Sequence, residues 1–593
     1  MLSSLASPPS LSSHFRPRLA GLLVRSAVHR ISSRACEIYG GQRRRGHEIE
    51  DLCGGISSRL AGGEIQELRR CVPSWSSRVA ARHVSASASG GAGLITSPRS
   101  GSRMDIASIP EPGFTPIPEH SPSSVYIHIP FCRRRCFYCD FTIVAVGERT
   151  NQTSDHQDSV MANYVDLVCK EIASTARKRG NCNDPALETV FFGGGTPSLL
   201  PVPLLARIMN ELRAHFQISE TAEIAMEMDP GTFDRQKLEG FLDCGISRVS
   251  LGVQSFQDEL LKSCGRAHGL QQVHDAVKTI HSTGLQNWSI DLIASLPNQT
   301  LDNWEQSLQQ TIAARPAHVS VYDLQIEEGT LFNRWYKAGE SPLPSDDKAA
   351  EFYRTASLRL REAGYEHYEV SNYARPGFQC RHNLVYWENR PYFAFGLGST
   401  SYVEGRRFSR PKKMREYKSY VASLELASDS EVSSSDDYPA NSVEDQILDT
   451  IMLSLRLARG LNLESFEASF GSSVTSTVCS RLIRFIDIGL VEALDGDCRL
   501  IPRDVYKKMF SEGGGEDELH SFNSSSEGLG PRVEEACTSE KPVRSVCASS
   551  ENMKRFETFE RKPAYVRLTD PEGFLLSNEV ISSIFSALPS GEL

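Results

Sequence analysis

The sequence predicts an α/β protein whose parallel strands curl into a barrel or part of one. Six short runs rich in β-branched and aromatic residues follow residue 123, and stretches of helical length separate them. With 40% apolar and 23% charged residues, the composition is that of a globular protein. Strands that alternate with helices form βαβ units, whose right-handed crossovers curl a parallel sheet. An open, doubly wound sheet is the competing architecture.

The expected elements follow one another at regular intervals. The strands are Val125–Phe131, Thr189–Gly193, Glu223–Met228, Arg248–Gln254, Trp288–Ala294 and Val319–Ile326. The helices are Met161–Arg177, Pro203–Phe216, Phe233–Cys244, Leu270–Ser282 and Leu301–Ala314. A block rich in Tyr, Asn and Gly, Tyr365–Tyr402, then predicts strands and loops.

The C-terminal part has a different pattern. An acidic, Ser-rich linker is expected over residues 428–443, because such a composition cannot form a packed core. The next expected elements are helices at Asp445–Ala458, Leu463–Phe470 and Thr475–Ile488 and a hairpin at Leu490–Ile501 with its turn at Asp495–Asp497. A Gly/Ser/Glu-rich insertion is expected over residues 511–553, and order resumes at Tyr565.

Charge is distributed unevenly. Residues 1–103 hold 15 Arg, no Lys and 6 acidic residues (+9), so the remainder carries 49 − 68 = −19. A body this acidic is a poor binder of phosphate backbones, so we expect no nucleic-acid partner. There is no run of about 18 apolar residues, so no transmembrane segment is expected.

The basic beginning of the chain has the composition of an organellar targeting signal. Residues 1–36 are rich in Arg and Ser and contain no acid, as mitochondrial and plastid transit peptides do. We therefore expect a transit peptide and a disordered leading segment over residues 1–120. The protein would then lie in an organellar matrix or stroma, with the mitochondrion favoured over the chloroplast. A disordered basic tail is the alternative.

Three cysteines stand apart from the others. The chain has 15, mostly scattered singly, as expected for free thiols in a reducing compartment. Cys132, Cys136 and Cys139, however, lie within eight residues just after a predicted strand. Thiolate-only ligation favours zinc or an iron–sulfur cluster, and three ligands leave a fourth position open for a substrate. The three arginines after Cys132 are expected to help stabilise the thiolates. The alternative is three unligated thiols.

These residues form part of a recognisable pattern. CxxxCxxC after a strand, with an aromatic residue before the last Cys, resembles the radical S-adenosylmethionine (SAM) superfamily. The words YIHIPFC, GGGTPS, EMDPGT, LGVQSF, IDLIASLPNQT and YEVSNYARPG resemble the oxygen-independent coproporphyrinogen III oxidases and their HemW-type relatives. The resemblance spans Ser123 to Tyr402 and resumes weakly near the C-terminus.

The resemblance implies a fold and a domain order. The fold is a partial (β/α)6 radical SAM barrel with a small β-containing extension and a C-terminal winged-helix-like α+β domain. The order would be a leading segment (1–120), the barrel core (121–330), the extension (331–427), the linker (428–443) and the C-terminal domain (444–593).

The resemblance also implies the site. Cys132, Cys136 and Cys139 would hold three irons of a [4Fe–4S] cluster, and SAM would chelate the fourth. The implied SAM contacts are Tyr126, Tyr138, Gly194, Gly195, Thr196, Glu227, Gln254, Arg266 and Asp291.

Each of these residue types has a chemical reason to bind SAM. Glycines let a ligand approach the backbone, an acid suits ribose hydroxyls, and an Arg fork suits a carboxylate. Singly, each also has a structural interpretation, namely a tight turn, a loop acid or a packing aromatic. Their shared position at strand C-termini, the functional face of such barrels, favours binding.

Two words separate the branches of the family. The oxidases resemble CxxxCxxCxC, whereas this chain has Phe141 at the last position, which speaks against decarboxylase activity. HemW-type haem chaperones carry HNxxYW, matched here by His382 to Trp387. Imidazole is a common haem ligand, so His382 is a candidate and Cys380 a second one. A structural His is the alternative.

The spacing of the HNxxYW motif predicts its conformation, and the family resemblance predicts the function. Residues five apart do not share a helix face, so we expect the HNxxYW word in a loop. We expect a protein that binds haem and transfers it to acceptor haemoproteins, with an electron donor as a further partner. Coproporphyrinogen III dehydrogenase, or another radical enzyme acting on a tetrapyrrole, is one alternative. A purely structural iron–sulfur protein is the other.

Overall fold

The computed structural model describes residues 121–148, 154–179, 185–426, 441–511 and 562–588. The predicted leading segment, most of the acidic linker and nearly all of the predicted insertion lie outside the described residues. Within the described residues no helix is both long and apolar enough to cross a membrane.

A nine-stranded sheet forms the first part of the fold, with the order β11-β1-β4-β5-β6-β7-β8-β10-β9. Six parallel strands make up its centre, and each overlaps a predicted strand. They are β1 (Ser124–Ile129), β4 (Leu187–Gly194), β5 (Ile218–Met228), β6 (Arg248–Gln254), β7 (Trp288–Ala294) and β8 (His318–Asp323). The predicted α/β barrel core with parallel strands is therefore confirmed.

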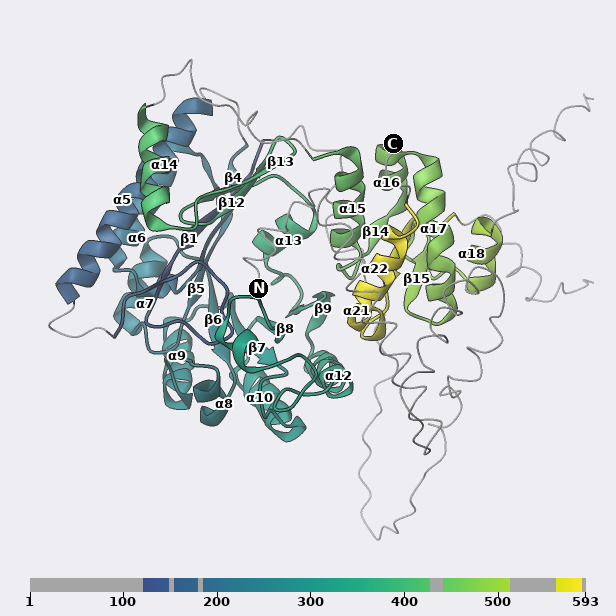
Figure 1. Ribbon diagram of the computed structural model, residues 1–593, viewed down its shortest axis with the longest axis horizontal. Coiled ribbons are helices and arrows are strands. Elements are labelled where there is room, and N and C mark those ends of the chain that lie inside the picture. The colour runs from purple at the N-terminus through teal and green to yellow at the C-terminus, as the bar shows by residue number, and fades with distance from the viewer. Residues whose placement is uncertain (1–120, 149–153, 180–184, 427–440, 512–561, 589–593) are drawn as a thin grey trace, which may run out of the picture. The chain divides into compact units, whose positions relative to one another are not determined.

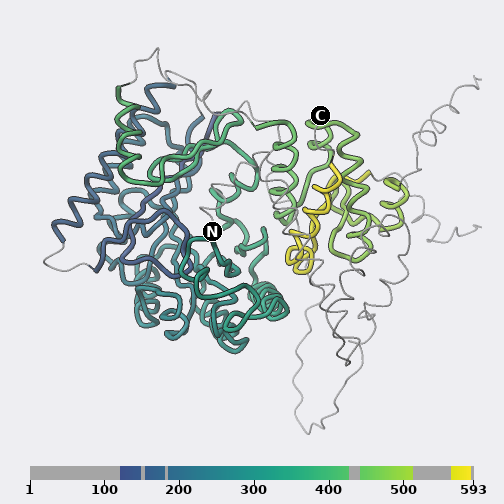
Figure 2. The backbone as a smooth tube through the Cα atoms, in the orientation of Figure 1, coloured from purple at the N-terminus to yellow at the C-terminus, as the bar shows by residue number. Residues whose placement is uncertain are grey.

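Helices connect these strands and cover one face of the sheet, as Figure 1 shows. The connecting helices are α5 (Ser154–Arg179), α6 (Val202–His215), α7 (Arg235–Asp243), α8 (Asp258–Ser263), α9 (Leu270–Thr283) and α10 (Leu301–Ala314), with a 3-10 turn η3 (Pro197–Leu199). Two further helices, α11 (Leu331–Trp335) and α12 (Asp346–Glu362), follow β8. Local sequence sets their ends. The Thr300 side chain accepts a hydrogen bond from the Asn303 amide and starts α10, a standard N-cap. The alternation of strand and helix can be followed along the tube in Figure 2.

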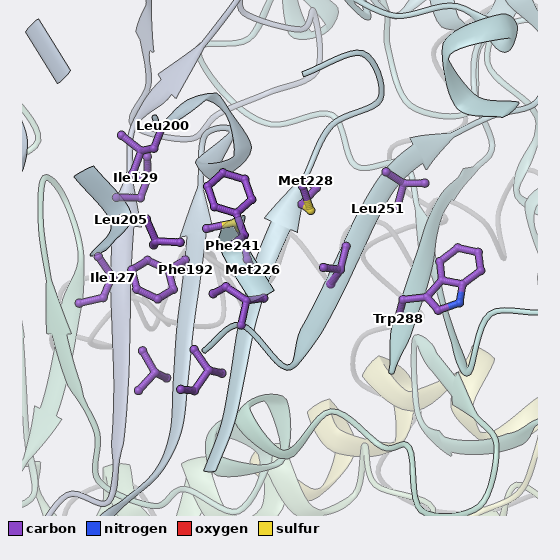
Figure 3. Packing of buried hydrophobic residues seen from close by; sticks show 14 of the residues in the cluster. Ile127, Ile129, Phe192, Leu200, Leu205, Met226, Met228, Phe241, Leu251 and Trp288 are labelled. Carbon is purple, nitrogen blue, oxygen red and sulfur yellow. The ribbon is translucent and has the colours of Figure 1, made fainter. Parts of the chain in front are cut away.

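The main core lies between the sheet and these helices. Figure 3 shows part of this core, in which apolar side chains of neighbouring strands pack together. In β6 the alternate residues Val249, Leu251 and Val253 are fully buried. Because successive side chains of a strand point to opposite faces, the other residues of β6 face the lumen of the barrel. The same alternation therefore builds the core and supplies polar groups to the lumen.

The segment after α12 extends the sheet at both edges. Its elements are β9 (Glu366–Glu369), β10 (Asn372–Ala374), α13 (Arg381–Trp387), β11 (Phe393–Phe395), β12 (Thr400–Val403), β13 (Arg406–Ser409) and α14 (Met414–Leu426). β11 pairs in parallel with β1, and β10 pairs antiparallel with β8 and β9.

The HNxxYW word forms the helix α13, so the predicted loop was wrong. The spacing that places His382 and Trp387 on different faces does not prevent a helix. It places His382 and Tyr386, four residues apart, on one face, and their side chains are hydrogen-bonded at 2.8 Å.

The C-terminal part contains helices and a three-stranded sheet of order β14-β16-β15. Its elements are α15 (Val443–Ser454), β14 (Leu461–Asn462), α16 (Leu463–Phe470), α17 (Ser472–Asp487), β15 (Val491–Leu494), α18 (Arg503–Phe510), β16 (Tyr565–Leu568), α21 (Glu572–Leu575) and α22 (Ser577–Phe585). The three predicted helices are present. The predicted hairpin is present in short form, with a bridge between Leu494 and Leu500 and a backbone hydrogen bond of 2.8 Å from Ile501 to Ala493, while β15 also pairs along its length with β16.

Candidate functional site

A cavity of about 190 Å³ lies where the central strands end. Eleven of the thirteen predicted site residues line it: Cys132, Cys136, Tyr138, Cys139, Gly194, Gly195, Thr196, Glu227, Gln254, Arg266 and Asp291. They come from the segment after β1 and from the carboxyl ends of β4 to β7, the edge at which parallel barrels bind ligands. Tyr126 and His382 do not line it.

The three cysteines lie on a loop that the barrel holds by backbone hydrogen bonds. The loop begins at β2 (Phe131–Cys132) and ends at β3 (Val144–Ala145), which pairs with β2. Between them, the Phe137 amide donates to the Cys264 carbonyl at 3.0 Å. Arg135 donates to the carbonyls of Cys139 and Phe141 at 3.0 and 2.9 Å. Arg135 therefore fixes the loop backbone, and its charge partly offsets the rise that burial causes in the pKa of Cys139, which is the role expected for these arginines.

The thiols suit a soft metal centre. Burial and the neighbouring cysteines raise the pKa of Cys132 to about 12, although Thr196 donates to its sulfur at 3.6 Å. Burial likewise raises the pKa of Cys139 to about 11. Without a cation these groups stay protonated, and a bound metal would displace the protons.

The three thiols are not placed so that they could bind one metal ion together. Among the described residues, no three His, Cys, Asp or Glu side chains gather closely enough to hold one metal ion. An iron–sulfur cluster does not require the cysteines to meet at a single ion, since each cysteine binds a different iron atom.

The glycine turn after β4 has a packing role beside the ligand role that we expected, and both glycines line the cavity. We expected the missing Cβ atoms to let a ligand approach. At Gly194, however, with φ 110°, a Cβ would lie 2.4 Å from the buried ring of His128. At Gly195 it would lie 2.7 Å from the backbone of Pro130 and Phe131. These glycines let the strand end pack against β1 and the start of the cysteine loop.

Two acids at the floor of the cavity differ in their partners. Glu227 accepts a hydrogen bond from the Gly194 amide at 2.8 Å. Burial nevertheless raises the pKa of Glu227 to about 7, and the charge of Asp291 adds to the shift. Burial also raises the pKa of Asp291, although Ser250 donates to its carboxylate. Near neutral pH, Glu227 can therefore both donate to and accept from a hydroxyl group.

Gln254 offers an unsatisfied acceptor to the cavity. It ends β6 with φ 68°, a left-handed conformation that is uncommon for a residue with a side chain. Its Oε1 is buried and has no hydrogen-bond partner. Because buried polar groups are nearly always paired, this atom fits a ligand that supplies an N–H or O–H group. Strained backbone is also typical of ligand sites.

Tyr126 and His382 are buried outside the cavity. The Tyr126 ring stacks on Phe191, and its hydroxyl lies 3.2 Å from His128 Nδ1. His382 is fully buried, with Nδ1 2.6 Å from Thr189 Oγ1 and Nε2 2.8 Å from Tyr386 Oη. Both ring nitrogens are thus engaged within the protein, so His382 cannot reach a haem iron unless α13 moves.

Cys380, the second haem-ligand candidate, is also buried. Its thiol lies 3.7 Å from a carboxylate oxygen of Glu223.

Sequence reasoning missed several residues of the cavity. They are Ser250, Tyr322, Gln325 and Glu327, among others. Strand alternation could have found Ser250, which lies two and four residues before the inward-facing Gly252 and Gln254. It could also have found Tyr322, two residues after the buried Ser320 on the same face of β8. The loop residues carry no periodic signal.

Comparisons with known proteins agree with this geometry. The family model described as "Radical SAM superfamily" matches residues 126–311, and the "HemN C-terminal domain" model matches residues 441–503. A heme chaperone HemW of Synechocystis is 37% identical over 79% of this chain and 97% of its own. The Escherichia coli heme chaperone HemW is 36% identical over 53% of this chain and 80% of its own.

Two further likenesses are more distant. A mitochondrial radical S-adenosyl methionine domain-containing protein of Danio rerio is 31% identical over 48% of this chain and 61% of its own. The solved structure of coproporphyrinogen III oxidase (HemN) from Escherichia coli has a TM-score of 0.52 at 22% identity. It covers 63% of this chain and 85% of that one. This likeness concerns the fold alone.

A parallel barrel with a cysteine triplet at its carboxyl edge, matched by that family model, defines a radical SAM protein. Within this superfamily, the identity and coverage of the cyanobacterial relative give a narrower assignment, and the chain belongs to the HemW family.

The packing at Gly194 leads to a prediction about stability. In Gly194→Ala, the new methyl group must displace the His128 ring and adopt a strained φ, so the free energy of unfolding should fall by about 2–4 kcal/mol. Gly284→Ala is the matched control, because its φ is also positive but nothing lies within 4 Å of the new atom. That variant should lose only about 1 kcal/mol, from backbone strain. Urea denaturation measures both, and equal losses would contradict the packing explanation.

Proposed function

We propose that this protein holds a [4Fe–4S] cluster on Cys132, Cys136 and Cys139, and SAM in the adjoining cavity. In this proposal it also binds haem and transfers it to acceptor haemoproteins. The observation that carries the first part is the single cavity that collects the three thiols and eight further predicted SAM contacts. The unpaired Oε1 of Gln254 and the amphoteric Glu227 provide complementary partners for a polar ligand there.

Residues of the protein position the cysteine loop and the groups of the cavity. When bound, the cluster would supply one-electron chemistry to the sulfonium of SAM, which is chemistry of the cofactor. Arg135 fixes the backbone of the cysteine loop, and Thr196 donates to the Cys132 sulfur. Ser250 donates to the Asp291 carboxylate at 2.8 Å and so holds this acid in place in the cavity.

The haem part of the proposal rests on the relatives. Several HemW relatives are named heme chaperones, at 30–37% identity. We assign no haem ligand, because both nitrogens of His382 are hydrogen-bonded in the protein interior.

The second candidate function is oxidative decarboxylation of coproporphyrinogen III. The similarity in fold to the Escherichia coli enzyme is compatible with this activity. Phe141 speaks against it, because this residue lines the cavity at the position where the oxidase pattern has a further cysteine.

We also propose an organellar location, in the matrix of mitochondria or the stroma of plastids. The Arg-rich, acid-free composition of residues 1–36 supports it. A fluorescent protein fused after residue 120 should enter an organelle, and the same fusion without residues 1–36 should remain in the cytosol. Identical distributions would contradict a targeting role.

The decisive experiment tests haem binding against turnover. With the cluster reconstituted anaerobically, haem is titrated while its absorbance is followed. Separately, coproporphyrinogen III is supplied with SAM and a reductant. We expect stoichiometric haem binding and no protoporphyrinogen. Turnover would instead establish the dehydrogenase function, and absence of both would refute the haem assignment.

The same titration decides the role of His382. Because its side chain fills a buried site and satisfies Thr189 and Tyr386, we expect His382→Ala to destabilise the fold by about 2–3 kcal/mol and to leave haem affinity unchanged. A folded His382→Ala variant with weakened haem binding and an altered spectrum would make His382 a ligand, and would require α13 to move.

The cluster assignment has its own test. Cys136→Ser should abolish the cluster's visible absorbance and lower the iron content, because one of three ligands is lost. Cys264→Ser is the matched control. Its buried thiol lies on the segment whose backbone carbonyl binds the Phe137 amide, and we assign it no iron. A control that loses the cluster equally would show that local disruption, and not ligand loss, explains the result.

A further inference from the structure

Arg266 connects the cysteine loop with the barrel. It follows α8, and its Nη1 donates to the sulfur of Cys136 at 3.4 Å and to the hydroxyl of Tyr138 at 3.2 Å. Its Nη2 donates to the Gly252 carbonyl at 3.0 Å and to a carboxylate oxygen of Asp229. One nitrogen of the fork thus binds the loop, and the other binds the barrel.

Asp229 is the anchor of this arrangement. It follows β5 and is mostly buried, with its side chain 14% exposed. His268 Nδ1 lies 3.3 Å and Arg133 Nη2 lies 3.6 Å from its oxygens. Burial alone would raise the pKa of Asp229, but Arg266, His268 and Arg133 lower it to about 2. The carboxylate is therefore charged throughout the physiological range and holds the guanidinium in one orientation.

This geometry changes the role expected for Arg266. The sequence suggested that its fork binds the carboxylate of SAM. In the structure, both terminal nitrogens already have protein partners, and only Nε is buried without one. A hydrogen bond from a cation to a cluster-binding sulfur has its own consequence. It stabilises the extra negative charge of the reduced cluster, so it raises the reduction potential.

We propose that Arg266, positioned by Asp229, donates to the Cys136 sulfur and raises the reduction potential of the cluster whether or not SAM is bound. The inference rests on the proposed function, since it requires Cys136 to be a cluster ligand. The redox step adds one electron to the cluster from a one-electron reductant such as dithionite, and no bond forms or breaks in it. Arg266 contributes charge and a hydrogen bond, and Asp229 contributes orientation.

The first test measures midpoint potential by a dithionite titration followed by electron paramagnetic resonance, without SAM. Arg266→Met removes the charge and the donor, so the potential should fall. Arg266→Lys keeps the charge but loses the fork, so the fall should be smaller. If the methionine variant holds no cluster, the potential of the lysine variant still tests the inference. Unchanged potentials in the variants, with weaker SAM binding, would overturn the inference and establish Arg266 as a carboxylate clamp.

A double-mutant cycle tests the positioning role of Asp229. In the Arg266→Met background, Asp229→Asn removes a negative charge and frees His268 and Arg133 but cannot act through Arg266, so it should raise the potential. With Arg266 present, the same change also frees the guanidinium, so the potential should rise less or fall. Equal effects in the two backgrounds would mean that Asp229 does not act through Arg266.

Two controls distinguish failure of the proposed function from failure of the inference about Arg266. Asp291→Asn removes another acid of the cavity that has no hydrogen bond to Arg266, and should raise the potential equally in both backgrounds. Iron and sulfide analysis of the wild-type protein comes first. If no cluster forms there, the proposed function fails. If a cluster forms but its potential is insensitive to Arg266, only the present inference fails.

Discussion

Every central strand of this barrel must satisfy two environments at once, and the rest of the structure depends on that constraint. One face packs against helices, so Val249, Leu251 and Val253 of β6 are apolar and fully buried. The opposite face lines the lumen, where Ser250 and Gln254 supply polar groups. Because the strands are parallel, their ends meet at a single edge, and one cavity collects the groups of five successive segments.

Much of this arrangement could be predicted from local sequence. The bounds of β6, β7 and α10 agree with the prediction residue for residue, because strand alternation, helical periodicity and a Thr cap all act within a few residues. The cysteine triplet was equally plain, since its spacing is local. The features that local sequence could not reveal depend on contacts between residues far apart in the chain. Nothing near Gly194 in the sequence indicates that the ring of His128 fills the space beside it.

The roles of the polar residues show the same limit. Position at or after a strand end predicted that Glu227 and Arg266 would line the cavity, but it could not say what each one contacts. Arg266 meets Cys136, 130 residues away, because a loop and a barrel segment converge in space. His382 was predicted from a motif to face a ligand, yet Thr189, almost two hundred residues earlier, engages its ring in the interior. A motif identifies a residue as important without fixing the direction of its side chain.

The order of the small C-terminal sheet has a consequence for how the chain matures. Its central strand, β16, comes last of the three in the chain, and both neighbours, β14 and β15, precede it by seventy residues or more. During synthesis these two outer strands emerge first and have no partner to pair with along their length. The sheet can close only when residues 565–568 have left the ribosome, so this domain completes its fold about seventy residues after β15 has been made.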